Sequence, residues 1–389
     1  MNKIVFISGT RADYGKIKPL MQKLEADDCF ELHIYVTGMH LLKEYGETYK
    51  EILNDGYQNV FIENGISLCS QMDVNLANTI LCFSRYIQDI KPDYIAVHGD
   101  RIDALAGAIV GMLNNIRVVH IEGGEVTGTV DDSIRHAITK ISHVHFTANE
   151  ESKARLIQLG ENEEHIYIIG SPDIDIMLSD SLPTKEEVLG KYNIPEDYAI
   201  FMYHPVVTEV DQIEGYMEEI GKAIEEDDRF YVFVYPNNDL GSDIIIKKID
   251  EICKNRPCYL TKSFPFEEFL TLLKNCQFMM GNSSAGIRES CIYGIPTINI
   301  GSRQNQRFNP LILKNIISVP EDAACIQQAI SEYRNYRFKS NYFGDGDSAE
   351  LFMKAMHKEI ESNAAIQKVF IDDEETVGKI SNFINEVCF

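Results

Sequence analysis

The sequence lacks the long hydrophobic runs that membrane proteins carry. No apolar run approaches the roughly 18 residues that a membrane-spanning helix needs, so we expect a soluble protein. The N-terminus, MNKIVFISGT, has one lysine and a short apolar run that ends in glycine. This pattern is typical of a first β-strand and not of a signal peptide.

Basic residues and closely paired cysteines are also scarce. The chain has 36 Lys and Arg against 60 Asp and Glu, a formal net charge of -24, which makes nucleic acid an unlikely general partner. A small anionic ligand remains compatible with this charge, because salt screening limits the reach of remote acids to about 10 Å. The nine cysteines include no CxxC pair, which indicates reduced thiols and a cytoplasmic location.

The chain does contain a regular alternation of short β-branched runs and amphipathic helical stretches. Its 389 residues are too many for one ordinary core, and the alternation predicts an α/β fold with two Rossmann-like domains and a cleft between them. We place the N-terminal domain at residues 1–175 and the C-terminal domain at residues 176–365. A C-terminal helix at 366–389 is expected to pack back on the first domain.

The expected strands of the first domain are Lys3–Ile7, Glu31–Val36, Asp93–Val97, Arg117–Ile121, Val144–Thr147 and His165–Ile169. Those of the second domain are Ala199–Tyr203, Tyr231–Tyr235, Gln277–Met280 and Thr297–Ile300. The tail from about Ser348 has two helical periods and could cross back onto the first domain. Open parallel sheets bind ligands beyond the carboxyl ends of their strands, so the residues that follow each strand are the candidates for a site.

The first strand is followed by SGTRADYGKIKPL, a glycine-bounded loop that leads into a helix. Free backbone N–H groups at a helix start favour phosphate, and Arg11 and Lys16 add positive charge there. The spacing is neither G-x-G-x-x-G nor a Walker loop, so it gives no support for nicotinamide or ATP. A simple βα turn with surface cations explains the segment equally well.

The most informative segment reads HGDRIDALAG and then HIEGGEVTGTVDDSIRHAITK. In it Asp100, Glu122 and Asp131 fall at strand ends or at a helix start, where neighbouring parallel strands would bring them together. Buried acids are rare unless they are paired or used, and clustered acids raise one another's pKa, which suits proton transfer. The structural alternatives are a helix cap for Asp131 and a loop-anchoring pair between Asp100 and Arg101.

An arginine and a histidine join the candidate set, and two further histidines are considered and set aside. Arg135 lies one turn into the helix that follows Asp131 and could face the same acids. His204 follows an apolar strand of the second domain, a position that favours a ligand contact as much as a structural role. His143 and His145 look like a metal pair, but they lie within a strand with no carboxylate nearby in sequence, so we expect no metal site.

In the second domain a buried strand runs into GNSSAGIRES, and a helix is expected over Ser284–Tyr293. Ser284 is expected to cap that helix, and the helix N-terminus would suit a diphosphate. Glu289 lies inside the helix, where it could accept hydrogen bonds from ribose hydroxyls. Arg303 follows the next strand and adds a cation. The alternative is an ordinary capped helix.

These stretches resemble the hydrolysing UDP-N-acetylglucosamine 2-epimerases, a family that includes bacterial enzymes of sialic acid biosynthesis. The matching stretches, in order, are GTRADYGKIKPL, VTGMH, HGDRIDALAG, HIEGGEVTGTVDDSIRHAITK, YHPVVTE, YPNNDLGS, GNSSAGIRE and GSRQNQR. The non-hydrolysing relatives usually carry Pro-Glu where this chain has Ala12-Asp13, which favours the hydrolysing branch.

The resemblance implies the GT-B type of two-domain fold, with UDP held mainly by the C-terminal domain and no cofactor. The UDP contacts implied by the matching motifs are Arg11, Arg101, His204, Asn237, Ser263, Phe264, Ser283, Ser284, Glu289 and Arg303. The implied acid/base groups are Asp100, Glu122 and Asp131, with His204 assisting at the phosphate. From the residues themselves, Lys16 and Arg135 join the binding set.

The implied reaction is UDP-GlcNAc plus water giving UDP and free ManNAc, through elimination to a 2-acetamidoglucal and rehydration. The nearest alternative is the same reaction on a UDP-2,4-diacetamido-2,4,6-trideoxyhexose of the legionaminic acid pathway. A GT-B glycosyltransferase and a UDP-sugar-binding regulator are more distant alternatives. The family also implies a homodimer or homotetramer.

Overall fold

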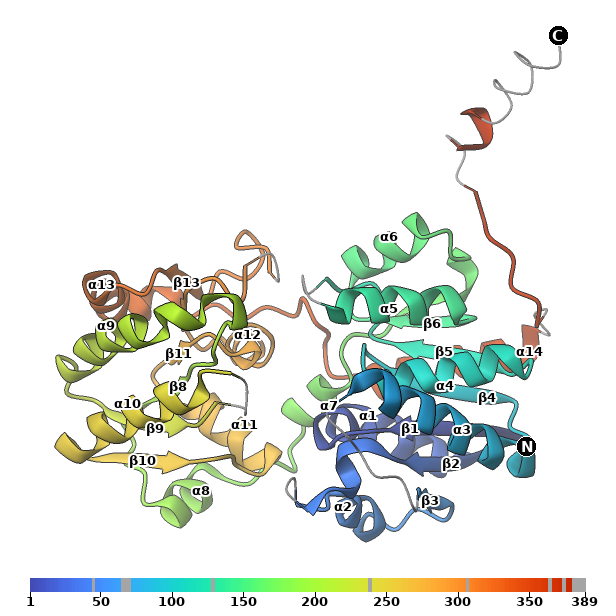
Figure 1. Cartoon of the computed structure of the whole chain (residues 1–389), viewed down its shortest axis with the longest axis horizontal. Coiled ribbons are helices and arrows are strands. Elements are labelled where there is room, and N and C mark those ends of the chain that lie inside the picture. Colours follow the sequence, from blue (N-terminus) through green and yellow to red (C-terminus); the bar gives the residue numbers. More distant parts are fainter. Residues whose placement is uncertain are drawn as a thin grey trace. The chain divides into compact units, whose positions relative to one another are not determined.

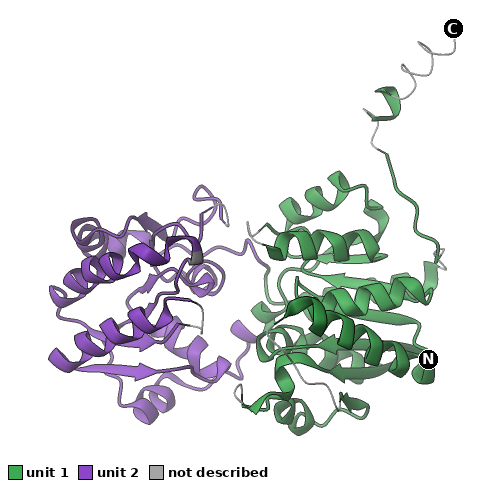
Figure 2. Cartoon of the chain, viewed as in Figure 1, with its two compact units in different colours: residues 1–175, 344–389 green, residues 176–343 purple. Residues whose placement is uncertain are grey.

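The computed structural model describes residues 1–43, 46–63, 71–126, 130–236, 240–305, 308–362, 366–372 and 376–379. The chain divides into two compact units, which Figure 2 distinguishes by colour. Unit 1 comprises residues 1–175 and 344–389, and unit 2 comprises residues 176–343. The chain thus returns to unit 1 at residue 344, whereas the expected second domain ran on to residue 365. None of the described helices is long and apolar enough to span a membrane.

Unit 1 is built on a seven-stranded parallel sheet with the order β3-β2-β1-β4-β5-β6-β7 (Figure 1). Its strands are β1 (Asn2–Ser8), β2 (Phe30–Val36), β3 (Val60–Ile62), β4 (Tyr94–His98), β5 (Arg117–Ile121), β6 (Val144–Thr147) and β7 (Ile166–Ile168). The accompanying α-helices are α1 (Arg11–Glu25), α2 (Tyr49–Asn54), α3 (Met72–Ile90), α4 (Ile102–Leu113), α5 (Val130–Ile141), α6 (Glu150–Gln158) and α14 (Ser348–Ser362). The strand order reverses between β1 and β4, and such a switch point is where doubly wound sheets bind ligands.

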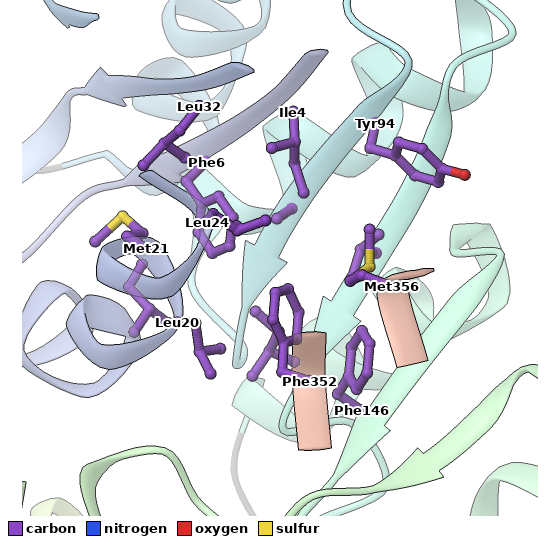
Figure 3. Close-up of a cluster of buried hydrophobic side chains, with 14 of the residues drawn as sticks. Ile4, Phe6, Leu20, Met21, Leu24, Leu32, Tyr94, Phe146, Phe352 and Met356 are labelled. Atoms are coloured by element: carbon purple, nitrogen blue, oxygen red, sulfur yellow. The ribbon is translucent and has the colours of Figure 1, made fainter. Parts of the chain in front are cut away.

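Both faces of this sheet are covered by other parts of unit 1. Successive side chains of a strand point to opposite faces, so buried neighbours along one strand belong to two different clusters. Ile4 and Phe6 belong to one buried cluster, while Val5 and Ile7 belong to another. Figure 3 shows the first cluster, in which Phe352 of α14 packs against side chains of the sheet. The ring centroid of Phe352 lies 6.4 Å from that of Phe6 and 4.6 Å from that of Phe146. Helix α14, from the end of the sequence, therefore completes a core that the first strand begins.

A single carboxylate joins the two points at which the chain crosses between the units. Asp175 lies in the short helix α7 (Asp173–Met177), and its oxygens accept hydrogen bonds from the backbone N–H groups of Ser348 and Ala349, at 2.9 and 2.8 Å. These N–H groups belong to the first turn of α14, which has no partner for them within the helix. The exit from unit 1 thereby caps the helix with which the chain returns.

Unit 2 repeats the same architecture with a six-stranded parallel sheet of order β10-β9-β8-β11-β12-β13. Its strands are β8 (Tyr198–Met202), β9 (Phe230–Val234), β10 (Cys258–Thr261), β11 (Met279–Gly281), β12 (Thr297–Ile300) and β13 (Ile316–Val319). The accompanying α-helices are α8 (Lys185–Tyr192), α9 (Ile213–Glu225), α10 (Ser242–Asn255), α11 (Phe266–Asn275), α12 (Arg288–Tyr293) and α13 (Ala323–Glu332). The switch point of this sheet lies between β8 and β11. The expected pair of Rossmann-like domains is confirmed.

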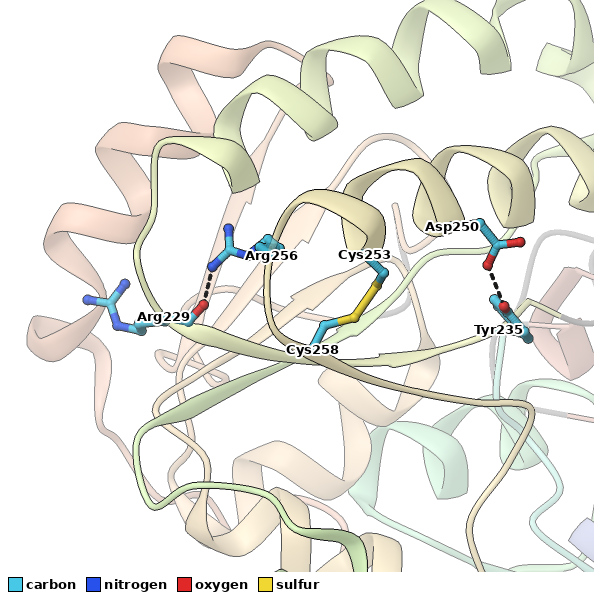
Figure 4. The surroundings of a disulfide bond; sticks show 6 residues. All are labelled: Arg229, Tyr235, Asp250, Cys253, Arg256 and Cys258. Carbon is cyan, nitrogen blue, oxygen red and sulfur yellow. Dashed lines mark hydrogen bonds between the residues drawn. A yellow bond between two sulfur atoms is a disulfide. The ribbon is translucent and has the colours of Figure 1, made fainter.

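One cysteine pair contradicts the expectation that the thiols are all reduced. Cys253, near the end of α10, forms a disulfide with Cys258, the first residue of β10, across a Cα–Cα distance of 5.9 Å (Figure 4). A spacing of five residues around a helix-to-strand turn brings two cysteines within the range that a disulfide spans. The other cysteines of the described residues, which are Cys29, Cys82, Cys276, Cys291 and Cys325, are free thiols.

Candidate active site

The switch point of unit 1 brings together the ends of β1 and β4. Thr10 caps α1, and its hydroxyl accepts a hydrogen bond from the backbone N–H of Asp13. The Asp13 carboxylate then accepts hydrogen bonds from the Ser8 hydroxyl at 2.9 Å and from Nδ1 of His98 at 2.7 Å. His98 is the last residue of β4. A carboxylate from the first helix and an imidazole from the fourth strand thus meet between the two strands.

Glu122 follows β5 and is a buried acid whose side chain contacts three other side chains. It is 5% exposed and has φ 61°, in the left-handed region that non-glycine residues seldom adopt. Nζ of Lys16 and Nε2 of His98 each lie 3.2 Å from its Oε2, and the Ser171 hydroxyl donates a hydrogen bond to Oε1. Unusual backbone geometry of this kind concentrates at functional sites. The structure therefore gives Glu122 cationic partners where the sequence suggested neighbouring acids.

The charge of His98 follows from its position between two carboxylates. Burial lowers the pKa of its imidazole, but the hydrogen bond to Asp13 and the charges of Asp13 and Glu122 outweigh burial and raise the pKa to about 9. His98 is therefore a cation at neutral pH. His120, on β5, is fully buried, and the loss of water lowers its pKa to about 3, so this second imidazole stays neutral.

The other two predicted acids lie in different settings. Asp100 forms an ion pair with Arg135, whose side chain is 6% exposed. Among the described residues, Nε and Nη1 of Arg135 are buried and have no hydrogen-bond partner. Helix α5 begins at Val130, so Asp131 lies within its first turn and not at the cap position that the sequence suggested. The structural alternative for Asp100 was a pair with Arg101, but its ion-pair partner is Arg135, and Arg101 is exposed at the start of α4.

The cations around α1 also differ from one another. Arg11, the first residue of the helix, is exposed, and its Nε lies 3.2 Å from Oε1 of Glu51. Lys16, one turn later, points to Glu122. Of the two residues that were expected to bind phosphate, one is thus exposed at the helix start and the other is engaged with an acid of the same unit.

A further acid that sequence reasoning missed packs beneath the same loop. Asp103, in the first turn of α4, is 8% exposed, and a Cβ on Gly9 would lie 2.1 Å from its Oδ2. Glycine at position 9 is therefore required for this carboxyl group to fit. Burial, reinforced by the charge of Asp13, raises the pKa of Asp103 to about 6.

Asp103→Asn is expected to stabilise the protein at pH 7.5 and to leave its stability unchanged near pH 4. A raised carboxyl pKa means that the folded state binds more protons, so the contribution of Asp103 to stability is lost as the pH rises from about 4 to about 6. The neutral amide avoids that loss, by up to about 3 kcal/mol at pH 7.5. Urea unfolding at both pH values measures the difference. A less stable variant at pH 7.5 would show that the carboxylate makes favourable contacts.

The switch point of unit 2 is organised by Asn282. Its side-chain oxygen accepts a hydrogen bond from the backbone N–H of His204 at 2.6 Å, and its amide donates to the His204 carbonyl at 2.8 Å. Nη1 of Arg303 and Nε2 of Gln304 donate to the Asn282 carbonyl, at 3.0 and 2.8 Å. Asn282 thus fixes the loops after β8, β11 and β12 to one another. Its place directly before the predicted Ser283, in the GNSSAGIRE stretch, is the signal that sequence reasoning had for it.

The loop after β11 differs from the expected helix over Ser284–Tyr293. Residues Ser284–Gly286 form a 3-10 turn capped by the side chain of Ser283, and the α-helix starts only at Arg288. The expected cap at Ser284 is therefore wrong, and Ser284 is exposed instead. Thr297 of β12 packs against this turn, and a Cβ on Gly286 would come within 2.6 Å of its side chain, so glycine suits the close approach at this position.

His204 is neutral at physiological pH. It is 7% exposed, and burial, together with the positive charge of Arg303, lowers the pKa of its imidazole to about 4. A neutral imidazole carries one N–H donor and one acceptor. His204 can therefore donate one hydrogen bond to an anionic ligand without carrying a charge.

The remaining predicted contacts are scattered over unit 2. Ser263 is exposed after β10, while Phe264 is buried and packs against Tyr192 and Tyr259 with ring centroids at 5.0 and 5.8 Å. Glu289 lies in the first turn of α12. Asn237 lies outside the described residues.

Two parallel sheets, each with polar side chains at its switch point, define a two-domain α/β protein of the GT-B type. The structure of a UDP-GlcNAc 2-epimerase from Neisseria meningitidis bound to UDP-GlcNAc matches 92% of this chain and 100% of that chain, with a TM-score of 0.77. At 17% identity, this likeness shows the fold alone.

The sequence comparisons carry the identification further. The profile of the family described as UDP-N-acetylglucosamine 2-epimerase matches residues 22–357. The chain is 44% identical over 378 residues, 96% of this chain and 99% of that protein, to a UDP-N-acetylglucosamine 2-epimerase of N. meningitidis serogroup B. The chain belongs to the UDP-N-acetylglucosamine 2-epimerase family and is an epimerase.

Two further relatives differ in their names. One is the UDP-N,N'-diacetylbacillosamine 2-epimerase (hydrolyzing) of Legionella pneumophila, 36% identical over 366 residues, 90% of this chain and 94% of that protein. The other is the polysialic acid biosynthesis protein P7 of Escherichia coli, 32% identical over 347 residues, 87% of this chain and 88% of that protein.

Proposed function

We propose that the protein is a hydrolysing UDP-GlcNAc 2-epimerase, which converts UDP-GlcNAc and water into UDP and ManNAc for sialic acid biosynthesis. The observation that carries this proposal is the setting of Glu122. It is a buried carboxylate in a strained backbone conformation, with Lys16 and His98 beside it, at the end of a strand next to the switch point. The relative named as a hydrolysing epimerase supports the reaction, and the relative named as a polysialic acid biosynthesis protein supports the pathway.

In this proposal unit 2 supplies most of the contacts to the UDP group. The proposed contacts at the diphosphate are Arg101, His204, Ser283, Ser284 and Arg303, and those elsewhere on the nucleotide are Arg11, Asn237, Ser263, Phe264 and Glu289. Charge develops on the diphosphate as it departs, so Arg303 and the neutral N–H of His204 would stabilise it. Because α12 is short and is preceded by a 3-10 turn, these side chains carry more of that role than a helix N-terminus.

The carboxylates of unit 1 supply the proton transfers. No carbonyl adjoins C2 of the sugar, so its proton becomes removable only as the bond between C1 and UDP breaks. Glu122 then takes the C2 proton and the 2-acetamidoglucal forms. Asp100 or Asp131 returns a proton to the opposite face of C2 while water adds at C1. The N–H groups on Nε and Nη1 of Arg135, which have no partner among the described residues, fit a contact with the sugar.

The proposal is tested by incubating the protein with UDP-GlcNAc in D2O and following the mixture by NMR. Free ManNAc that carries deuterium at C2, together with UDP, is the expected result. UDP-ManNAc would mean the non-hydrolysing reaction. Binding of UDP without turnover would favour a regulator, and transfer of the sugar to an acceptor without deuterium at C2 would favour a glycosyltransferase.

The alternative substrate is a UDP-2,4-diacetamido-2,4,6-trideoxyhexose, and the name of the Legionella relative favours it. The higher identity to the Neisseria UDP-N-acetylglucosamine 2-epimerase favours UDP-GlcNAc. Turnover of both nucleotide sugars at equal enzyme concentration decides between them. A larger kcat/KM on the diacetamido sugar would reassign the substrate and leave the reaction unchanged.

A homodimer or homotetramer is also part of the proposal. Helices α3 and α4 pack together and expose apolar side chains, with Leu81 52% and Leu113 69% exposed. Such side chains are commonly covered by a second copy of the chain. Sedimentation velocity of the protein and of Leu81→Asp tests this.

A cytoplasmic location stays a prediction, and the Cys253–Cys258 bond counts against it.

A further inference from the structure

His98 is enclosed between two carboxylates that belong to different parts of the chain. Its Nδ1 lies 2.7 Å from Oδ1 of Asp13, and its Nε2 lies 3.2 Å from Oε2 of Glu122. The side chain is 9% exposed, so these two acids, and not bulk water, surround the polar atoms of the ring. The reaction proposed above gives neither His98 nor Asp13 a role.

The far side of Asp13 is fixed by a chain of donors. The Ser8 hydroxyl donates to Asp13, so the 3.1 Å contact between Ser8 and Nε2 of His40 has the imidazole as donor. Nδ1 of His40 then accepts from the Thr48 hydroxyl at 2.7 Å. Burial lowers the pKa of His40 to about 4, so its ring is neutral and keeps this single tautomer. Both oxygens of Asp13 therefore accept hydrogen bonds, and Asp13 faces His98 as an acceptor.

We propose that His98 is a positioning residue of the epimerase reaction, whose ring is held by Asp13 and fixes the Glu122 side chain in orientation and charge. This inference rests on the proposed role of Glu122. His98 approaches Oε2 from β4, whereas Lys16 approaches the same oxygen from α1, so two elements constrain one carboxylate. That constraint keeps Glu122 at the end of β5 in spite of its left-handed backbone.

A second buried histidine shows what Asp13 contributes. His145, on β6, is 1% exposed and has its Nε2 3.1 Å from Glu161, so it has one carboxylate partner. Burial lowers the pKa of His145 in spite of that partner, and nearby Lys368 lowers it further. His98 also has a glutamate partner, Glu122, and it has Asp13 in addition, whereas His145 has Lys368 nearby. Removing the Asp13 charge is therefore expected to lower the pKa of His98 towards that of a buried histidine with one carboxylate partner.

The charged and titratable groups near His98 come from helix α1 and from strand β5 with the residue that follows it. Asp13 and Lys16 belong to α1, Glu122 follows β5, and His120 lies on β5. His120 remains neutral, with Nε2 bound to the Gly99 carbonyl at 2.9 Å, so it does not compete for the carboxylates. Lys16 is the cation that remains beside Glu122 when His98 loses its proton.

The first test is an NMR titration of the histidine Cε1–H signals of the full chain, with His98 identified by its loss in His98→Gln. In the wild-type protein we expect His98 to titrate near pH 9. In Asp13→Asn we expect the midpoint to fall by at least about one pH unit, because one carboxylate charge is lost. A wild-type midpoint at or below 6.5, the ordinary value for histidine, would overturn the proposal. This measurement does not depend on activity.

The second test is the pH profile of kcat for UDP release. Loss of the His98 proton frees Glu122 to move, so kcat is expected to fall above pH 9 in the wild type, and Asp13→Asn is expected to shift that fall to lower pH by the same amount as the NMR midpoint. KM is expected to stay within about threefold, because positioning acts on the chemical step. His145→Gln is the matched control, since it removes a buried histidine from a glutamate elsewhere in unit 1 and should leave the pH profile in place.

A change that acts in the opposite direction covers the case in which Asp13→Asn does not fold. Ser8→Ala removes a donor from Asp13 and keeps its charge, so it should raise the midpoint of His98 and move the fall in kcat to higher pH. A purely structural His98 would leave the pH profile unmoved in both variants, and that result overturns the proposal. If His98 titrates near pH 9 but the wild type releases no UDP from either nucleotide sugar, the proposed function fails, and with it the link between His98 and the reaction.

Discussion

Glu122→Gln is expected to slow the release of UDP from UDP-GlcNAc by about 10²- to 10⁴-fold, the usual contribution of a positioned acid/base group. The amide has the same shape as the carboxylate but cannot accept the C2 proton. Glu122 is 5% exposed and Ser171 donates to its other oxygen, so the substitution keeps the local packing. KM is therefore expected to stay within about threefold. Single-turnover kinetics of UDP release measure the elimination step directly.

Glu161→Gln is the matched control for this experiment. Glu161 is another buried glutamate of unit 1, 3% exposed, with His145 and Lys140 beside it at 3.1 and 2.8 Å. Its loss should lower the thermal stability of the protein and leave kcat near the wild-type value. Equal losses of kcat in both variants would mean that a buried charge, and not proton transfer, explains the effect. A normal rate of UDP release by Glu122→Gln would end its assignment as the base.

Gly281→Ala is expected to prevent stable folding of unit 2. Gly281 ends β11 with φ 130°, a conformation that L side chains rarely adopt, and a Cβ there would lie 1.9 Å from the carbonyl oxygen of Met202. That oxygen belongs to the neighbouring strand β8 and also accepts a hydrogen bond from the backbone N–H of Asn282. Backbone strain and the clash together should cost at least about 3 kcal/mol. Urea unfolding and the yield of soluble protein report the loss.

Gly215→Ala provides the opposite expectation in the same unit. Gly215 lies within α9, and no atom lies within 4 Å of a Cβ placed there. Alanine in a helix is favoured over glycine by about 0.5–1 kcal/mol, so this variant should be slightly more stable than the wild type. If Gly281→Ala unfolded no more easily than Gly215→Ala, the close approach of β11 to β8 would be in doubt.

The sheets could be predicted from the sequence where strands are buried on both faces. Strands such as β5 and β12 are rich in buried β-branched residues, and their observed bounds equal the expected ones. The three strands that were not expected, β3, β10 and β13, lie at sheet edges. Their side chains are mostly half-buried and the strands are only three or four residues long, so their sequences carry a weak strand signal. An edge strand owes its conformation to its single neighbour more than to its own residues.

The acids of the candidate site could be identified from the sequence, but the residues that contact them could not. Glu122 and Asp100 stand out because they follow strands. The contact between His98 and Asp13 joins residues 85 positions apart, and only the adjacency of β1 and β4 in the sheet brings them together. Asp13 entered the sequence argument as a marker of the hydrolysing branch alone. The Asp100–Arg135 pair likewise depends on how α5 packs.

The return of the chain to unit 1 has a consequence for the order of folding during synthesis. Unit 2 is an insertion, because residues 176–343 lie between the two parts of the chain that form unit 1. All of unit 2 is therefore synthesised before α14 supplies Phe352 and Met356 to the core of unit 1. On the ribosome, where domains usually fold from the N-terminus onward, the first unit to be synthesised here must wait while the second can already fold. The exposed core that α14 later covers is the surface that a nascent chain of this protein must keep from aggregating.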